Sequence, residues 1–282
     1  MELTPFPVPI AMGTLHGLRG GEPGGARVIA LHGWLDNAAS FVPLASRLRG
    51  VELLMPDLPG HGRSVHLGPG AEYTSGVAVN AVLDLADALG WDEFSLLGHS
   101  MGAGIASLVA ASSPRRVRRL VVIEALGGLA ETVERTAARW QEAIAAARAL
   151  PGKRLRVFPD LAAPVRARMQ ANQLSEPSAR LLVERGVREV EGGYVWSSDP
   201  RLTLPTPQRL DEAQIAALVA SIACPTRVIY AEPAQPYFPE PLRTTRARLL
   251  PHGELIVLPG SHHLHMDDAD AVAAAIGDFF LA

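Results

Sequence analysis

The 282-residue sequence predicts an α/β protein with a mostly parallel, doubly wound sheet and a helical insertion. Three observations predict this fold class. Short apolar runs alternate with longer helical patterns towards both ends of the chain. This strand pattern disappears between Gly127 and about Ser221. A glycine-flanked serine, in the sequence Gly-His-Ser-Met-Gly at 98–102, stands between an apolar run and a helical pattern of small residues.

Six runs have the character of strands buried on both faces, because each is short, apolar and followed by a Gly, Pro or polar turn. They are Arg27–Leu31, Val51–Pro56, Phe94–Leu97, Leu120–Glu124, Thr226–Ala231 and Glu254–Leu258. Helices are expected at Ser40–Leu48, Val77–Leu89, Met101–Ser112 and Ala269–Leu281.

The middle of the chain has a helical pattern with no strands of the kind found elsewhere. Helices are expected at Glu131–Leu150, Leu161–Asn172, Ser178–Val190 and Asp211–Ser221. The segment Gly192–Leu204 is either a hairpin or an extended crossing. We therefore expect a core domain made of residues 1–126 and 222–282, and a helical cap, or lid, made of residues 127–221.

Composition excludes several classes of protein. The chain has 26 Lys+Arg against 29 Asp+Glu, a net charge of −3 and no basic tract, which argues against nucleic-acid binding. A single cysteine, Cys224, excludes a disulfide framework. The N-terminal sequence does not have the pattern of a signal peptide, and no run is long and apolar enough for a membrane helix. A soluble, cytoplasmic protein is the expectation.

Ser100 is the candidate nucleophile. It follows the predicted strand FSLL and precedes the helical pattern AGIASLVAA, the strand–turn–helix setting of a nucleophile elbow. Glycines at 98 and 102 fit this setting, since side chains there would collide with neighbouring backbone. The alternative is a solvated serine in a glycine-rich turn.

Two backbone N–H groups are candidates for an oxyanion hole, which would stabilise the charge formed when an ester is attacked. One is the N–H of Met101, directly after the nucleophile. The other is the N–H of Trp34, at the end of the first strand in the sequence Leu-His-Gly-Trp. His32 in the same turn is expected to position the loop by bonding to backbone, rather than to take part in catalysis.

His262 is the candidate general base. It lies after the last predicted strand, two residues after Gly260, where a loop could direct it back to the nucleophile. His263 and His265 are expected to pack or hydrogen-bond locally. A metal site is the alternative use of such a histidine cluster, but no matching ligand set stands elsewhere in the sequence, so neither a metal nor a cofactor is expected.

Two carboxylates could orient that histidine. Glu124 ends an apolar strand, where an unpartnered carboxylate would be costly, and it is preferred for that reason. Glu232 follows a later strand and is the alternative acid. The carboxylate more commonly expected in that later loop would stand about two residues beyond Glu232, where this chain has Ala234.

These motifs together resemble the α/β-hydrolase superfamily. The resemblance rests on LHGW at 31–34, MPDLPGHGRS at 55–64, GHSMG at 98–102 and SHHLHMDD at 261–268, which stand in the superfamily's order. Within it, HGWLDNAASF at 32–41, GGYVWSSDPRL at 192–202 and HHLHM at 262–266 are most similar to serine hydrolase-like proteins. In the DLPGHGRS loop, Asp57 is expected to brace the turn.

The resemblance implies an α/β-hydrolase fold, with Ser100 as nucleophile, His262 as base, and Trp34 and Met101 as oxyanion donors. An acid at the position of Glu124 resembles the arrangement in haloalkane dehalogenases. Those enzymes and epoxide hydrolases attack through an aspartate, however, and this chain has Ser100 at that position.

The sequence therefore predicts a cofactor-independent serine hydrolase acting on a carboxylic ester or a related acyl compound, with a small molecule as its partner. Thioesters and lactones are the alternatives among substrates. A hydrolase scaffold kept only for binding, as a small-ligand receptor or partner protein, is the alternative outside enzymes.

Overall fold

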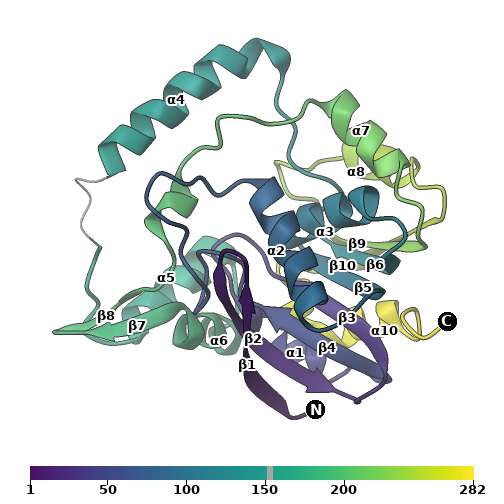
Figure 1. Cartoon of the computed structure of the whole chain (residues 1–282), viewed down its shortest axis with the longest axis horizontal. Coiled ribbons are helices and arrows are strands. Elements are labelled where there is room, and N and C mark those ends of the chain that lie inside the picture. Colours follow the sequence, from purple (N-terminus) through teal and green to yellow (C-terminus); the bar gives the residue numbers. More distant parts are fainter. Residues whose placement is uncertain (151–154) are drawn as a thin grey trace.

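An eight-stranded sheet is the centre of the molecule in a computed structural model that describes residues 1–150 and 155–282 (Figure 1). Residues 151–154 fall within the predicted insertion and lie outside the described residues. The strands are β1 (Leu3–Ile10), β2 (Gly13–Gly21), β3 (Ala26–Leu31), β4 (Val51–Pro56), β5 (Phe94–His99), β6 (Val117–Ile123), β9 (Thr226–Glu232) and β10 (Gly253–Pro259).

The order of strands in the sheet is β1-β2-β4-β3-β5-β6-β9-β10. β1 and β2 pair antiparallel with each other, and β2 pairs antiparallel with β4. All remaining pairs are parallel, so the carboxyl ends of β3, β5, β6, β9 and β10 meet at one edge. All six predicted strands are present, and the mostly parallel, doubly wound sheet is confirmed.

Helices cover both faces of the sheet (Figure 1). The helices of the core are α1 (Val42–Ala45), α2 (Ser75–Ala88), α3 (Met101–Ser112), α7 (Glu212–Ala220), α8 (Leu242–Ala247), α9 (Leu264–Asp267) and α10 (Ala269–Ile276). One apolar cluster joins α2, α3 and α7 to one face, and a second joins α1 and α10 to the other. Neighbouring residues of a strand divide between the two clusters. Leu96 belongs to the first and Leu97 to the second, as expected for a strand buried on both sides.

The antiparallel hairpin β1–β2 was not among the predicted strands. β1 has proline at every second position from Pro5 to Pro9, and proline within a run normally argues against a strand. β1 is the outermost strand, however, so a missing N–H there costs no ladder bond on the side that faces away from the sheet.

The segment between β6 and β9 holds the remaining elements. They are α4 (Thr136–Ala149), α5 (Ala162–Asn172), α6 (Glu176–Gly186), β7 (Val187–Val190) and β8 (Gly193–Trp196). The segment also contains α7, which was expected to belong to the cap of residues 127–221 but shares the apolar cluster of α2 and α3. The expected helix through Val190 is wrong in its last turn, because residues 187–190 form β7. β7 pairs antiparallel with β8, so this part of the segment is a hairpin.

Buried ion pairs and hydrogen bonds fasten α5 and α6 to the core. Arg185 on α6 donates two hydrogen bonds to the buried carboxylate of Asp57, at 2.9 and 2.8 Å. Asn37 donates to the carbonyl of Leu182 on the same helix at 2.8 Å. By contrast, α4 lies away from the sheet (Figure 1), and its Trp140 is 42% exposed. Within this segment α5 and α6 are thus docked on the core, whereas α4 exposes the apolar side chain of Trp140.

Among the described residues, none of the helices is both long and apolar enough to cross a membrane.

Candidate active site

Three side chains that are distant in the sequence meet at the carboxyl edge of the sheet. Ser100 stands between β5 and α3, Glu124 directly after β6, and His262 in the loop that follows β10. Ser100 Oγ lies 3.0 Å from His262 Nε2, and His262 Nδ1 lies 3.1 Å from Glu124 Oε2. The three form one hydrogen-bonded chain, in which Nδ1–H donates to the carboxylate and the serine hydroxyl donates to Nε2.

Ser100 is held in a strained turn. Its φ of 52° and ψ of −118° are unusual for a residue with a side chain. The turn is tight on both sides. A Cβ added to Gly98 would lie 2.5 Å from the Cα of Ala103, and one added to Gly102 would lie 2.0 Å from the carbonyl oxygen of Leu31. Only glycines at these two positions allow the backbone to pass this closely, and the hydroxyl is thereby placed at the N-terminus of α3.

Glu124 reaches the histidine from the end of β6. It is 5% exposed and has a positive φ of 62°. Its Oε1 accepts a hydrogen bond from the backbone N–H of Ala231 at 2.5 Å, while Oε2 accepts from His262. Both oxygens of this buried carboxylate are therefore satisfied, which removes the cost of placing it in an apolar strand.

The alternative acid, Glu232, is not brought to the histidine. Its side chain is 64% exposed, and its nearest ionic partner is the guanidinium of Arg243, 3.8 Å away. Glu232 ends β9 and Glu124 follows β6, and these are adjacent parallel strands. Of these two carboxylates, only that of Glu124 contacts the imidazole of His262.

The two predicted oxyanion donors belong to two turns, one after β3 and one after β5, which are adjacent parallel strands. Met101 is the first residue of α3, where a backbone N–H has no partner within the helix. Trp34 lies in the turn after β3 and is 53% exposed, and its indole N–H donates to the carbonyl of Leu202 at 2.9 Å. Trp34 is therefore not a core residue, and its side chain connects the turn to the segment that carries α4–α6.

His32 has the loop-positioning contacts expected of it. Its Nδ1–H donates to the carbonyl of Gly33 at 2.8 Å, and its Nε2 accepts from the backbone N–H of Leu58 at 2.9 Å. Burial lowers the pKa of His32, so the ring is neutral and can accept that bond. The histidine thus joins two loops at the edge of the sheet and makes no contact with Ser100.

Tyr237 is a site residue that the sequence did not indicate. Its hydroxyl oxygen lies 3.2 Å from Nδ1 and 3.4 Å from Nε2 of His262, and the two rings are nearly perpendicular. Both ring nitrogens already have partners in the plane of the imidazole, and near-equal distances place the hydroxyl over the ring face. Burial and the Glu124 carboxylate raise the pKa of Tyr237 to about 12, so its hydroxyl is protonated at neutral pH. No motif marks a tyrosine in this loop.

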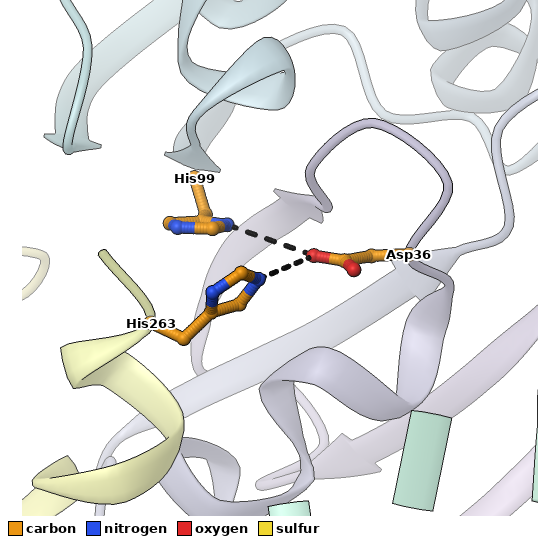
Figure 2. Close-up of side chains that lie close together, drawn as sticks. All are labelled: Asp36, His99 and His263. Carbon is orange, nitrogen blue, oxygen red and sulfur yellow. Dashed lines mark hydrogen bonds and ion pairs between the residues drawn. The ribbon is translucent and has the colours of Figure 1, made fainter. Parts of the chain in front are cut away.

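A second cluster consists of Asp36, His99 and His263 (Figure 2). Its two histidines are next to Ser100 and His262 in the sequence. One ligand atom of each lies within 4.8 Å of the others, which is close enough for the three to share a metal ion. Arg168 is already paired with one oxygen of Asp36, however, and His263 Nε2 lies 3.2 Å from the other. A divalent cation would compete with a guanidinium for this carboxylate, so the contacts favour an ion-pair network over a metal site.

His265 and Asp57, two further buried polar residues of the motifs, also have local partners. His265 is fully buried, and its Nε2 lies 2.9 Å from Ser40 Oγ. Asp57 accepts hydrogen bonds from the backbone N–H groups of Ala38 and Arg63, which is the turn-bracing role expected of it. Its ion pair with Arg185 was not anticipated.

Comparisons with known proteins identify the family of this chain. The family described as "alpha/beta hydrolase fold" matches residues 26–224. A serine hydrolase-like protein of Dictyostelium discoideum is 31% identical over 268 residues, covering 90% of this chain and 74% of the relative. A serine hydrolase-like protein of Danio rerio is 29% identical and covers 97% of this chain and 87% of that protein.

Solved structures have the same architecture. A hypothetical protein from Pseudomonas aeruginosa PAO1 superposes with a TM-score of 0.91 at 40% identity, over all of both chains. The thioesterase domain from the curacin biosynthetic pathway superposes with a TM-score of 0.84 at 24% identity, again over all of both chains, and shows the shared fold. This chain belongs to the α/β-hydrolase fold family, within its serine hydrolase-like group.

Proposed function

We propose that this protein is a serine hydrolase that cleaves a carboxylic ester of a small molecule through an acyl-enzyme on Ser100. One observation carries the proposal: Ser100 Oγ lies 3.0 Å from His262 Nε2, and the opposite nitrogen of that ring lies 3.1 Å from the buried carboxylate of Glu124. This is the order of nucleophile, base and orienting acid that acyl transfer requires.

In the first half of the reaction, Ser100 Oγ attacks the carbonyl carbon as its proton passes to His262 Nε2. Glu124 stabilises the resulting imidazolium and holds Nδ1–H in place. The N–H groups of Met101 and Trp34 are proposed to bind the oxyanion, and each such donor is worth about 3–4 kcal/mol in other hydrolases. The intermediate then expels the alcohol, which takes the proton from Nε2.

In the second half, water attacks the acyl-enzyme. His262 accepts a proton from the water, and the second tetrahedral intermediate releases the carboxylic acid as the proton returns to Ser100. All steps use the same imidazole, alternately as base and acid. Tyr237, a residue that is 52% exposed, lies beside the imidazole, and we propose that a substrate approaches past it.

A fluorophosphonate probe tests this proposal. The wild-type protein is expected to react covalently with the probe and to hydrolyse p-nitrophenyl esters, and Ser100→Ala should lose both properties while keeping its melting temperature. A folded wild-type protein that neither reacts with the probe nor hydrolyses any such ester would contradict the proposal, and would favour a ligand-binding role for the scaffold. A panel of acyl esters, thioesters and lactones then ranks the substrate classes by kcat/KM.

A further inference from the structure

Asp36 is a buried carboxylate that the hydrolytic steps above do not use. We propose that Asp36 is a positioning residue that aligns Ser100 with His262 and makes this alignment depend on the docking of helix α5. The inference rests on the proposed function, since it concerns the same serine and histidine. Asp36 lies in the turn after β3, two residues beyond Trp34, and is 2% exposed.

Asp36 contacts the chain neighbours of both catalytic side chains (Figure 2). His263 directly follows the base, and its Nε2–H donates to Asp36 Oδ2 at 3.2 Å. His99 directly precedes the nucleophile, and its Nδ1 lies 3.9 Å from the same oxygen. Asp36 is thus bonded to the residue that directly follows the proposed base, and it lies close to the residue that directly precedes the proposed nucleophile.

His99 closes the connection between the two loops. Its Nε2–H donates to the backbone carbonyl of His262 at 2.8 Å, and its ring packs against the ring of His262 with centroids 4.8 Å apart. Burial and the neighbouring histidines lower the pKa of His99 well below its usual value, so the ring is neutral. With the proton on Nε2, His99 Nδ1 makes no hydrogen bond to Asp36, and the two side chains are only in packing contact. The backbone that carries His262 is therefore held from two directions.

The other oxygen of Asp36 faces helix α5, in the segment between β6 and β9. Oδ1 is paired with the guanidinium of Arg168 on α5, whose side chain is only 12% exposed. His263 and Arg168 together hold the pKa of Asp36 below its usual value despite its burial, so the carboxylate is charged. A single buried charge therefore joins the turn after β3, the loop of the base and helix α5.

This arrangement matters because the proposed reaction is sensitive to small displacements. A misplacement of about 1 Å in a catalytic pair commonly costs about a hundredfold in rate. Withdrawal of Arg168 would leave a buried carboxylate with His263 as its one remaining hydrogen-bond partner, and the turn or the histidine loop would have to move to give it another. Docking of α5 and alignment of Ser100 with His262 are thereby coupled.

The chain offers a matched control. Arg185 on α6 forms a second buried pair, with Asp57, which also joins the segment to the core. Asp57 bonds to Ala38, Arg63 and Arg185, and none of these contacts involves His99 or His263. Comparing Arg168→Met with Arg185→Met therefore separates a specific effect through Asp36 from a general loosening of the segment.

The experiment measures ester hydrolysis, the rate of fluorophosphonate labelling and the melting temperature of each variant. Asp36→Asn should lower kcat and the labelling rate about 10- to 100-fold with KM within about threefold, because geometry rather than binding is lost. Arg168→Met should lower kcat about three- to tenfold. The double variant Asp36→Asn/Arg168→Met should be no slower than Asp36→Asn within about twofold, because both changes act through one carboxylate.

Arg185→Met should lower the melting temperature while kcat stays within about twofold of wild type. If Asp36→Asn fails to fold, His263→Leu removes only the imidazole donor and should still lower kcat about tenfold. Asp36→Asn or His263→Leu with wild-type labelling would overturn the proposal, as would equal kcat losses in Arg168→Met and Arg185→Met. Failure of the wild-type protein itself to label would instead contradict the proposed hydrolase function.

Discussion

Two features constrain Glu124: its carboxylate is buried, and its backbone has a left-handed conformation. It follows directly after an apolar strand, where a carboxylate needs partners, and its backbone has a positive φ of 62°. The structure supplies the partners, with Ala231 N–H on one oxygen and His262 on the other. The preference for Glu124 over Glu232 could be argued from the sequence on desolvation alone, but their distances to the imidazole could not.

Two matched amide substitutions test this assignment. Glu124→Gln should lower kcat about a thousandfold or more, because the amide neither fixes the tautomer of His262 nor balances the imidazolium. Glu232→Gln should leave kcat within about twofold, since that side chain is 64% exposed and makes no contact with His262. Steady-state kinetics on one p-nitrophenyl ester gives both numbers. The opposite ranking would show that the acid has been wrongly assigned.

At the scale of elements, the position of Ser100 depends on how closely β5, α3 and β3 approach one another. The glycines of the elbow were explained from the sequence by expected collisions, and the collisions are present around Gly98 and Gly102. The antiparallel hairpin β1–β2 was not predicted, because the alternating prolines of β1 argue against a strand unless that strand lies at the edge of a sheet. Edge position is a property of the sheet, which no single segment reveals.

Gly102→Ala tests the close approach at the elbow. The new methyl would lie 2.0 Å from the carbonyl oxygen of Leu31, so either α3 or β3 must shift. We expect a loss of at least about 1–3 kcal/mol of unfolding free energy, the usual cost of overpacking, together with a loss of fluorophosphonate labelling.

Gly76→Ala is the control for this substitution. Gly76 lies in α2, and a methyl there would have its nearest neighbour at an ordinary 3.7 Å. Its stability should be equal to that of wild type or slightly higher, because alanine favours helix. Denaturant titrations of both variants provide the comparison, and equal stabilities would contradict the packing described at the elbow.

At the scale of the whole molecule, several histidines are buried at the carboxyl edge of the sheet. Burial lowers the pKa of His32, His99 and His265, and lowers that of His61 to about 3. Each ring is neutral in the folded state but takes up a proton near pH 6.5 in the unfolded chain. The unfolded state therefore binds more protons below pH 6.5, and the stability that these groups contribute at neutral pH is lost as the pH falls.

We expect the unfolding free energy to decrease as the pH is lowered from 6.5 towards 3, by up to about 1.4 kcal/mol per pH unit for each such histidine. Urea titrations at pH 8, 6 and 5 measure this dependence. His61→Asn should make it shallower, whereas the same change at the exposed His252 should leave it unaltered. A stability that does not vary over this range would show that these rings are not neutral and buried as described.

The sequence by itself determined the fold class, the strand–turn–helix setting of Ser100 and the candidates for base and acid, because these depend on local patterns: apolar runs of strand length, glycines around a serine, and a histidine after the last strand. Only the tertiary structure decided which carboxylate contacts His262, that Tyr237 lies over its ring, and that Asp36 joins His263 to Arg168. The residues that meet in these contacts are 25 to 227 positions apart in the chain. Such separations are closed by the packing of strands and helices, and no local pattern in the chain encodes them.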